Sequence, residues 1–409
     1  MRVLCVSAPL AGHLDWGGYL ATAATLQRRG HTVCWASGTA VAAQVVAAGL
    51  AFHALAETGW RWPPPPPLPS PLPDDPTADP ETRRHAMQLR ALDQWLDPPR
   101  VATATAELLT LARSFRPHLI LSEMFIAAAG IVAEVMDCPL VVMGWPAPAP
   151  AHSADPVVAH ARTRLDELLT RFAATGAHFS PHGPPALNAG HGHVTFWSPS
   201  WFGDRELGAQ TVHKGGLRGV RPSDYRPDPA LPASDDAPWV LITLGTSFNA
   251  DPNFFIAAAH AVANLGGLPL IALGADMTVP WAASLRGRLP ATAIVRPTFD
   301  FAQVLPDVAA AVHHGGAGTT HALVTHAVPQ IIVPHAADQG RQAYAAQQCG
   351  VGIHLPAKQV TLPRLEAALA TVLPDRSPLR MAATALQAEF HALGGVPAAA
   401  DWLETLDLG

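Results

Sequence analysis

The sequence contains few basic residues, and this shortage excludes several classes of binding partner. Only two lysines, Lys214 and Lys358, occur in 409 residues, and 26 basic against 32 acidic side chains leave a formal net charge of −6. No basic run is present that could bind nucleic-acid phosphates or an anionic membrane surface. We therefore expect no nucleic-acid partner, although a shallow peripheral membrane contact through aromatic side chains stays open.

Cysteine pairs and long apolar runs are also absent. Cys5, Cys34, Cys138 and Cys349 lie far apart and form no CxxC pair, which indicates neither a disulfide framework nor a cysteine zinc site. No uncharged apolar run reaches the length of about 18 residues that a membrane-spanning helix needs. The N-terminal apolar run is short and is interrupted by Pro9, unlike a signal peptide. These features predict a cytoplasmic protein with no transmembrane segment.

Hydrophobic residues make up 49% of the chain, and they occur as short runs of strand length between helical patterns. Buried parallel strands have such continuous apolar runs. The first residues predict a strand at 2–7, a loop at 8–15, a helix at 16–29 and a strand at 32–35, which is the start of a doubly wound sheet. Further strands are expected at 119–121, 140–143, 239–244, 268–273, 309–313 and 330–333.

Two proline-rich segments interrupt this order. Residues 60–80 contain PPPPP and read as an exposed excursion, either a flexible insertion or a lid. Residues 221–238 are rich in Pro, Asp and Ser, as linkers are. We therefore expect an N-terminal Rossmann-like domain at 1–220, a linker at 221–238 and a C-terminal Rossmann-like domain at 239–385. Helices in 386–409 are expected to pack back toward the N-terminal domain.

A glycine-rich segment, HHGGAGTT, begins at His313, follows an expected strand and precedes a helical pattern. Glycines allow close approach of the backbone to a ligand, and a helix N-terminus offers unpaired N–H groups to an anion. Beside them, His314 and Thr319 add hydrogen-bond donors. This pattern favours a diphosphate site, whereas the alternative is a tight turn that needs glycine only for packing.

Asp338 and Gln339 follow the next expected strand and begin a helix. In an open α/β sheet the carboxyl ends of the strands carry the ligand site, so this pair is expected beside the glycine-rich segment. A carboxylate and an amide make directed hydrogen bonds to hydroxyls and suit a sugar. The alternative is that Asp338 only caps the helix.

His13 lies in the loop after the first expected strand. A histidine there can act as a general base when a carboxylate orients its other nitrogen. Glu123, at the end of the strand at 119–122, is the best-placed candidate, and Asp15 is a local alternative. The simpler interpretation is an exposed histidine, since the chain has 20.

Together these segments resemble the family-1 glycosyltransferases, and most of all the bacterial branch that decorates natural products. The resemblance is strongest from 239 to 352, is moderate around GHLDWGGYL and is weak from 60 to 238. It implies the α/β GT-B fold, in which two Rossmann-like domains with doubly wound parallel sheets face an interdomain cleft. The segments that carry the C-terminal part of the resemblance are LITLGTSF, AVHHGGAGTTHAL, VPQIIVP and DQGRQA.

The resemblance also implies roles for individual residues. His13 matches the base that takes the proton from the acceptor hydroxyl, and Glu123 stands where the family usually has an aspartate that holds this histidine. Phe299 would contact the base of the nucleotide through its backbone, and the choice among UDP, dTDP and GDP stays open. The residues expected to bind the donor are Thr246, Ser247, Phe299, His314, Gly316, Gly318, Thr319, Asp338 and Gln339.

Aromatic residues are concentrated before the expected linker, where eight of the eleven tryptophans lie. If several line a binding site, they suit a large apolar acceptor; the alternative is core packing, first of all for Trp35. His178, His182, His191 and His193 lie in one loop region, but no suitably spaced cysteine or carboxylate accompanies them, so no metal site is expected. The residues expected to bind the acceptor are Trp16, Trp60, Trp62, Phe125 and Trp145.

The resulting prediction is an inverting glycosyltransferase that needs neither metal nor cofactor. It would transfer a sugar from a nucleoside diphosphate donor to a hydroxyl of an apolar small molecule. The alternatives are a non-catalytic partner or binding module with the same fold, and a sugar-nucleotide epimerase. The acceptor, the sugar, the atom that is glycosylated and the oligomeric state stay open.

Overall fold

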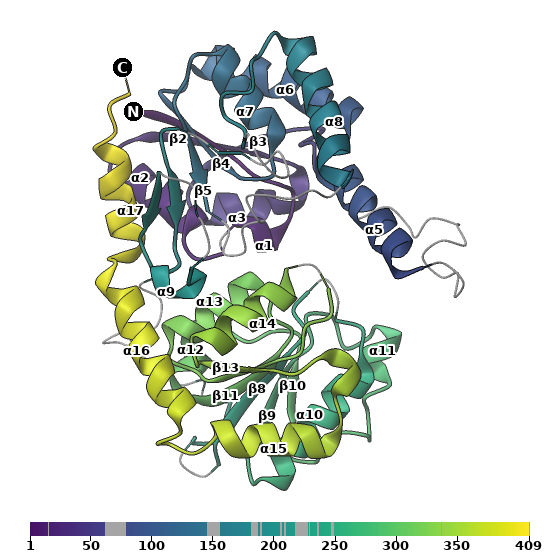
Figure 1. Ribbon diagram of the computed structural model, residues 1–409. Helices are drawn as coiled ribbons and strands as arrows, with labels where there is room; N and C mark the ends of the chain where they lie inside the picture. The colour runs from purple at the N-terminus through teal and green to yellow at the C-terminus, as the bar shows by residue number, and fades with distance from the viewer. Residues whose placement is uncertain are drawn as a thin grey trace. The chain divides into compact units, whose positions relative to one another are not determined.

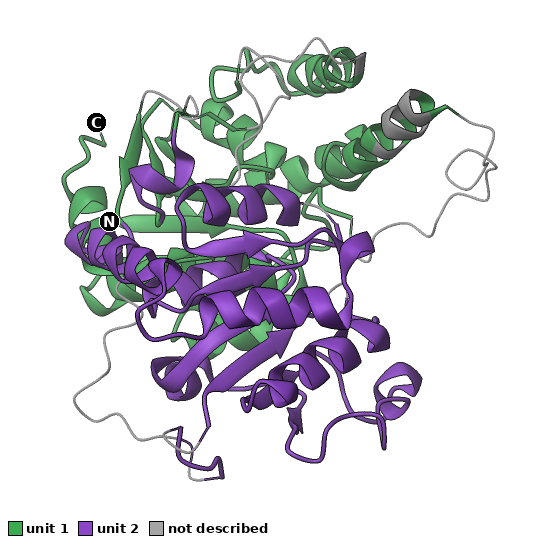
Figure 2. Cartoon of the chain, turned by 60° about the horizontal axis from the view of Figure 1, so that its bottom comes forward, with its two compact units in different colours: residues 1–196, 204–214, 396–409 green, residues 197–203, 215–395 purple. Residues whose placement is uncertain are grey.

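The structure is a computed structural model that divides into two compact units, coloured separately in Figure 2. Unit 1 comprises Met1–Phe196, Asp204–Lys214 and Val396–Gly409, and unit 2 comprises Trp197–Gly203 and Gly215–Gly395. The residues that the structure describes are 1–14, 16–61, 79–144, 156–180, 187–188, 190–204, 207, 210–216, 228, 230–234, 237–246, 249–336 and 338–408.

Unit 1 is built on a seven-stranded sheet in the order β3-β2-β1-β4-β5-β6-β7, and every neighbouring pair is parallel. Parallel neighbours need crossover connections, which helices supply. The strands are β1 (Arg2–Val6), β2 (Thr32–Ser37), β3 (Ala51–Ala54), β4 (Leu119–Glu123), β5 (Leu140–Met143), β6 (His193–Thr195) and β7 (Thr211–His213). The helices are α1 (Ala11–Leu14), α2 (Tyr19–Arg28), α3 (Ala42–Ala47), α5 (Pro80–Trp95), α6 (Pro98–Phe115), α7 (Ala127–Val135), α8 (Pro156–Phe172) and α17 (Gly395–Glu404), with a 3₁₀ turn at Thr39–Val41.

Successive residues of the unit 1 strands enter two separate cores, one on each face of the sheet. Leu4 and Ile120 belong to the core that also contains α6, α7 and α8. Cys5 and Leu121 belong to the opposite core, which contains α2 and α17. Because both faces are covered, the central strands β1, β4 and β5 are buried along nearly their whole length, as the sequence predicts.

The C-terminal helix α17 completes this second core. Leu403 is fully buried there. Arg29, directly after α2, pairs with Asp401 at 2.7 Å and with Glu404 at 2.8 Å. These contacts join α17 to α2 and to the sheet of unit 1.

Unit 2 contains a six-stranded sheet in the order β10-β9-β8-β11-β12-β13, again parallel throughout. Its strands are β8 (Trp239–Thr243), β9 (Leu268–Ala272), β10 (Ile294–Arg296), β11 (Val308–His313), β12 (Gln330–Ile332) and β13 (Gly352–His354). Its helices are α9 (Pro199–Phe202), α10 (Pro252–Asn264), α11 (Pro280–Ala283), α12 (Phe301–Val304), α13 (Ala317–Thr325), α14 (Gln339–Gln348), α15 (Leu362–Val372) and α16 (Pro378–Ala392), with 3₁₀ turns at Leu305–Asp307 and Ala357–Gln359.

Helices cover both faces of the second sheet as well (Figure 1). Helices α10 and α15 pack against one another, and both contribute to the core that contains Val240 and Ile242. Leu323 of α13 contributes to the core on the other face, together with Trp239 and Leu241. Asp251 begins α10 as predicted, because its side chain accepts a hydrogen bond from the main-chain N–H of Phe254 at 3.1 Å.

Each sheet has one topological switch point, where the strand order reverses. The switch points lie between β1 and β4 in unit 1 and between β8 and β11 in unit 2. Ligands of open α/β sheets bind at the carboxyl ends of the strands at such points. A ligand site is therefore expected at the loops that follow β1, β4, β8 and β11.

Two local predictions were wrong. The helix expected at 16–29 begins only at Tyr19, because Gly17 and Gly18 have φ values of +138° and +157°, which a helix does not allow. A Cβ on Gly18 would also lie 2.5 Å from the ring of Phe196. The segment expected as a loop at 8–15 contains the short helix α1, and the long helices α6 and α8 were not predicted.

Most of the two proline-rich segments lies outside the described residues, so the predictions of an excursion at 60–80 and a linker at 221–238 stay predictions. Among the helices that the structure does describe, none is both long and apolar enough to cross a membrane.

Candidate active site

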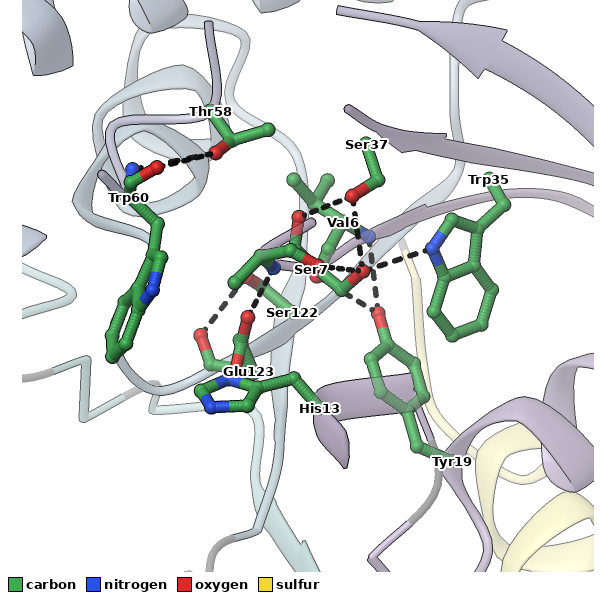
Figure 3. Close-up of polar contacts among 11 residues, drawn as sticks. Val6, Ser7, His13, Tyr19, Trp35, Ser37, Thr58, Trp60, Ser122 and Glu123 are labelled. Atoms are coloured by element: carbon green, nitrogen blue, oxygen red, sulfur yellow. Dashed lines mark hydrogen bonds and ion pairs between the residues drawn. The ribbon is translucent and has the colours of Figure 1, made fainter. Parts of the chain in front are cut away.

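His13 and Glu123 meet at the switch point of the first sheet. His13 lies in α1, shortly after β1, and Glu123 is the last residue of the neighbouring strand β4. Nδ1 of His13 lies 2.6 Å from Oε2 of Glu123 (Figure 3). Because an ionised carboxylate only accepts hydrogen bonds, Nδ1 carries the proton and Nε2 keeps its lone pair. The pair therefore leaves one imidazole nitrogen able to accept a proton.

The carboxylate of Glu123 is held through both oxygens. Its side chain is fully buried, whereas that of His13 is 20% exposed. Oε1 of Glu123 accepts a hydrogen bond from the main-chain N–H of Ala8. Glu123 thus reaches Nδ1 of His13, and its orientation is set by the main chain just after β1.

A hydroxyl network holds the ends of β1 and β4 together behind this pair (Figure 3). The Tyr19 hydroxyl accepts from the main-chain N–H of Val6 at 3.0 Å and donates to the carbonyl of Leu121 at 2.8 Å. Burial raises the pKa of Tyr19 well above its ordinary value, so the group stays a donor. Trp35 of β2, whose ring centroid lies 4.5 Å from that of Tyr19, donates from Nε1 to Oγ of Ser7 at 3.0 Å.

Aromatic rings surround His13 on unit 1. The rings of Trp16 and Trp60 each have their centroid 4.9 Å from that of His13. The ring centroid of Phe125 lies 5.8 Å from that of Trp60, and the ring centroid of Trp95 lies 5.6 Å from that of Phe125. The structure thus groups three of the expected acceptor residues with His13 and adds Trp95. Trp95 was counted in the tryptophan-rich region, but no spacing in the sequence relates it to His13.

In unit 2, His314 follows β11 and lies between two glycine-containing loops. A Cβ on Gly245 would lie 2.7 Å from the imidazole of His314, and a Cβ on Gly316 would also overlap it. A Cβ on Gly315 would lie 3.0 Å from the main-chain carbonyl of Gln339. The loops after β8, β11 and β12 therefore converge at one edge of the second sheet, and glycine is needed for their close approach.

His314 is buried and uncharged at neutral pH. Burial lowers its pKa to about 4, an effect that the main chain of Thr243 partly opposes and nearby His335 increases. A neutral imidazole can still donate one N–H. Gly316 precedes α13, and Gly318 and Thr319 lie in the first turn of that helix, where N–H groups lack helical partners.

His313 supports the same loop from inside the core, and it was missed as a functional residue. Its Nδ1 accepts a hydrogen bond from the main-chain N–H of Gly315 at 3.2 Å, and its Nε2 lies 3.0 Å from Oε1 of Gln330. Burial, and then the neighbouring His314, lower the pKa of His313 to about 3. The sequence showed two adjacent histidines but not which one faces the core.

Asp338 and Gln339 lie at the start of α14. Asp338 occupies the N-cap position, yet its side chain makes no capping hydrogen bond, contrary to the simple cap interpretation. Oε1 of Gln339 accepts from the main-chain N–H groups of His335 at 2.8 Å and Ala336 at 2.9 Å. The amide nitrogen of Gln339 is thereby the group left to donate.

The other expected donor residues are more scattered. Thr246 is exposed in the loop after β8, and the Phe299 side chain is buried in a core, with the Arg296 guanidinium 5.1 Å from its ring centroid. Asp15, Trp62, Trp145 and Ser247 lie outside the described residues, so their expected roles stay predictions.

The histidine-rich segment forms no metal centre in the part of the chain that is described. His178 and His191 have their ring centroids 6.3 Å apart, and burial lowers the pKa of His193 to about 4. Among described residues, no three His, Cys, Asp or Glu side chains group as metal ligands would. His182 lies outside the described residues.

Sequence comparison finds relatives for part of the chain. Residues 282–399 match the family model of the C-terminal domain of erythromycin biosynthesis protein CIII-like proteins. NDP-glycosyltransferase YjiC of Bacillus subtilis (strain 168) is 28% identical over 170 residues, 42% of each chain. L-demethylnoviosyl transferase of Streptomyces niveus is 35% identical over 156 residues, which are 36% of this chain and 39% of that protein. The matches span about two fifths of these relatives' length.

Structural comparison covers almost the whole chain. The glycosyltransferase of kitacinnamycin superposes with a TM-score of 0.72 at 22% identity and 98% coverage of both chains. Spinosyn rhamnosyltransferase SpnG with thymidine diphosphate gives a TM-score of 0.69 at 22% identity, covering 99% of this chain and 100% of that one. These findings confirm the predicted fold and the predicted resemblance: the chain has the GT-B fold and is similar to the family-1 glycosyltransferases of bacterial natural-product pathways.

Proposed function

We propose that the chain is an inverting glycosyltransferase that transfers a sugar from a nucleoside diphosphate donor to a hydroxyl of an apolar small molecule. The observation that carries the proposal is the 2.6 Å contact between Nδ1 of His13 and Oε2 of the buried Glu123. This contact orients the imidazole and leaves Nε2 as a base at the switch point of unit 1.

In the proposed reaction, Nε2 of His13 accepts the proton of the acceptor hydroxyl while the hydroxyl oxygen attacks the anomeric carbon of the sugar. The negative charge of Glu123 stabilises the imidazolium that forms. The bond from the anomeric carbon to the diphosphate breaks as the new bond forms on the opposite side. A single displacement of this kind inverts the configuration at that carbon.

The loops of unit 2 suit the leaving group. Negative charge grows on the diphosphate as the bond breaks, and N–H groups already aimed at it lower the barrier. The first turn of α13 supplies such donors, and the helix dipole adds to them. We propose that these groups stabilise the diphosphate without a metal ion.

Asp338 and Gln339 would bind the sugar itself. Both residues lie at the start of α14, and Gln339 has its amide nitrogen available because its oxygen is bound to the loop. One residue can accept from sugar hydroxyls and the other can donate to them.

The aromatic group around His13 supports an apolar acceptor. Trp60, Phe125 and Trp95 are partly buried and extend from the imidazole along unit 1. Rings in this arrangement stack well on planar or extended apolar molecules. Structures of similar fold contain thymidine diphosphate and, in another case, a spinosyn aglycone, which agrees with a donor such as dTDP-sugar and a natural-product acceptor.

The test is the variant His13→Ala, assayed by release of dTDP or UDP from dTDP-glucose or UDP-glucose in the presence of quercetin, alizarin and umbelliferone. We expect transfer to fall by about 10²–10⁴-fold, the usual contribution of a positioned base. Calorimetric titration should show unchanged affinity for the nucleoside diphosphate, because His13 belongs to the other unit. Full transfer activity of the variant would overturn the mechanism.

Two results would favour other functions. Nucleotide binding with no transfer to any acceptor would favour a non-catalytic binding module. Turnover of the donor without an acceptor, with proton exchange at a sugar carbon, would favour an epimerase.

A further inference from the structure

Side chains take over from the sheet of unit 1 just after β1. This strand ends at Val6, whose partners in the register are Ala36 of β2 and Ser122 of β4. Each of the two neighbouring strands continues by one residue, to Ser37 in β2 and to Glu123 in β4. These two side chains therefore flank the main chain where it leaves β1.

The peptide group between Ser7 and Ala8 connects the two side chains. Oγ of Ser37 donates to the carbonyl of Ser7 at 2.9 Å, and the N–H of Ala8 donates to Oε1 of Glu123 (Figure 3). The carbonyl and the N–H of a trans peptide point in opposite directions, so the hydroxyl and the carboxylate hold one rigid plane from its two sides. A hydrogen bond to the carbonyl also polarises the peptide group and strengthens the bond that its N–H donates.

This peptide group stands between Ser37 and the proposed base. Oε1 of Glu123 is bound to Ala8, and Oε2 lies 2.6 Å from Nδ1 of His13. We infer that Ser37 is a positioning residue, which orients His13 through the peptide group after Ser7 and then through Glu123. The inference rests on the proposed function, since it assigns the role of the base to His13. Ser37 itself is fully buried and acts only through the main chain.

The surroundings of Ser37 argue that its hydroxyl is not needed to hold the strands together. The Tyr19 hydroxyl already links Val6 of β1 to Leu121 of β4. The preceding residue of β2, Ala36, is equally buried without a polar side chain. A buried hydroxyl costs free energy unless it is hydrogen-bonded, so the bond to the carbonyl of Ser7 is what its presence provides.

The test is Ser37→Ala, assayed by transfer from dTDP-glucose or UDP-glucose to quercetin, alizarin or umbelliferone. We expect kcat to fall about three- to tenfold with unchanged nucleotide affinity, because one orienting hydrogen bond is lost. In a Glu123→Gln background the same substitution should change kcat by less than about twofold, because the path from Ser37 to the base is already broken. A merely structural defect would lower kcat by the same factor in both backgrounds.

A proton NMR signal gives a second readout that needs no substrate. The proton between Nδ1 of His13 and Glu123 should appear far downfield in the wild type, be absent in His13→Ala and move upfield in Ser37→Ala. Thr105→Val is the matched control, because it removes another fully buried hydroxyl of unit 1 that donates to a carbonyl, that of Val101 at 2.7 Å. This control should change neither the signal nor kcat. If Ser37→Ala does not fold, Ser37→Cys replaces it with the same expected direction, because a thiol is only a weak donor.

The outcomes distinguish the inference from the proposed function. Suppose that His13→Ala and Glu123→Gln lose transfer, while Ser37→Ala leaves kcat and the signal unchanged or lowers kcat equally in both backgrounds. The inference is then overturned and the proposed function stands. A wild type without the downfield signal would also overturn the inference. Full transfer by His13→Ala would overturn the proposed function and the inference together.

Discussion

Replacement of His313 by leucine tests whether the glycine-rich loop of unit 2 depends on a buried neutral imidazole. His313 has no exposed surface and bridges two groups, the main-chain N–H of Gly315 and the side-chain oxygen of Gln330. Since Nδ1 accepts from Gly315, the ring proton lies on Nε2 and is donated to Gln330. Leucine fills most of the space but can neither accept a hydrogen bond from Gly315 nor donate one to Gln330.

The structure sets the size of the effect. The variant leaves two buried polar groups without partners, each at a cost of about 1–3 kcal/mol, so we expect a loss of about 2–6 kcal/mol in the free energy of unfolding. Gly315 lies against the start of α14, so the loop should loosen where the diphosphate is proposed to bind. Affinity for dTDP and UDP should therefore fall too.

The pH dependence gives the prediction a second signature. The pKa of His313 is lowered to about 3 in the folded chain, against 6.5 ordinarily, so its stabilising effect is complete above pH 6.5. Between pH 6.5 and 3 the unfolded chain binds a proton that the folded chain does not, and stability falls by about 1.4 kcal/mol per pH unit for this group. The leucine variant has no titrating group at position 313 and does not lose this stability. The difference in the free energy of unfolding between wild type and variant should therefore shrink on acidification.

The assay is urea unfolding of both proteins from pH 7 to pH 4, with hydrogen exchange of β11 to confirm that the change lies in unit 2. His53→Leu is the matched control, because His53 is exposed at the edge of unit 1. A variant as stable as the wild type at pH 7, or a difference that does not depend on pH, would refute the reasoning.

Two further predictions concern unit 1. In Glu123→Gln the side-chain oxygen can still accept from Ala8, but the amide can donate to Nδ1 of His13 and so place the ring proton on Nε2. We therefore expect kcat to fall by about 10²–10⁴-fold while nucleotide affinity is unchanged. A near-normal kcat in a transfer assay would contradict this. Trp60→Leu should raise the KM for an aromatic acceptor, because the Trp60 ring contacts His13 and Phe125. The KM for the donor should change little, because Trp60 belongs to unit 1 and the donor is proposed to bind unit 2. Steady-state kinetics with both substrates measures both constants, and a rise confined to the donor KM would refute the assignment.

Local chemistry explains why much of this architecture could be predicted. The central strands are buried on both faces and apolar, so they were visible as apolar runs, whereas the more exposed strands β3, β7 and β10 were not predicted. Asp251 followed by proline is a strong helix start, and α10 begins there. The loop that carries His314 was recognisable because close backbone approach needs glycine, and Gly316 does lie against that imidazole.

Local patterns failed where glycine dihedrals or distant contacts decided the outcome. The start of α2 depends on the positive φ of Gly17 and Gly18, and the latter makes room for Phe196. Helices α6 and α8 owe much of their stability to the shared core of unit 1.

At the site, the amino-acid sequence showed which residue types are present and which of them follow a strand. It pointed to His13, Glu123, His314 and the Asp338–Gln339 pair as candidates. That His13 and Glu123, 110 residues apart, touch is a property of the fold, because β1 and β4 are neighbours at the switch point. The hydrogen bonds of His313 were equally invisible, since the direction of a buried side chain depends on partners that only the packed fold brings within hydrogen-bonding distance.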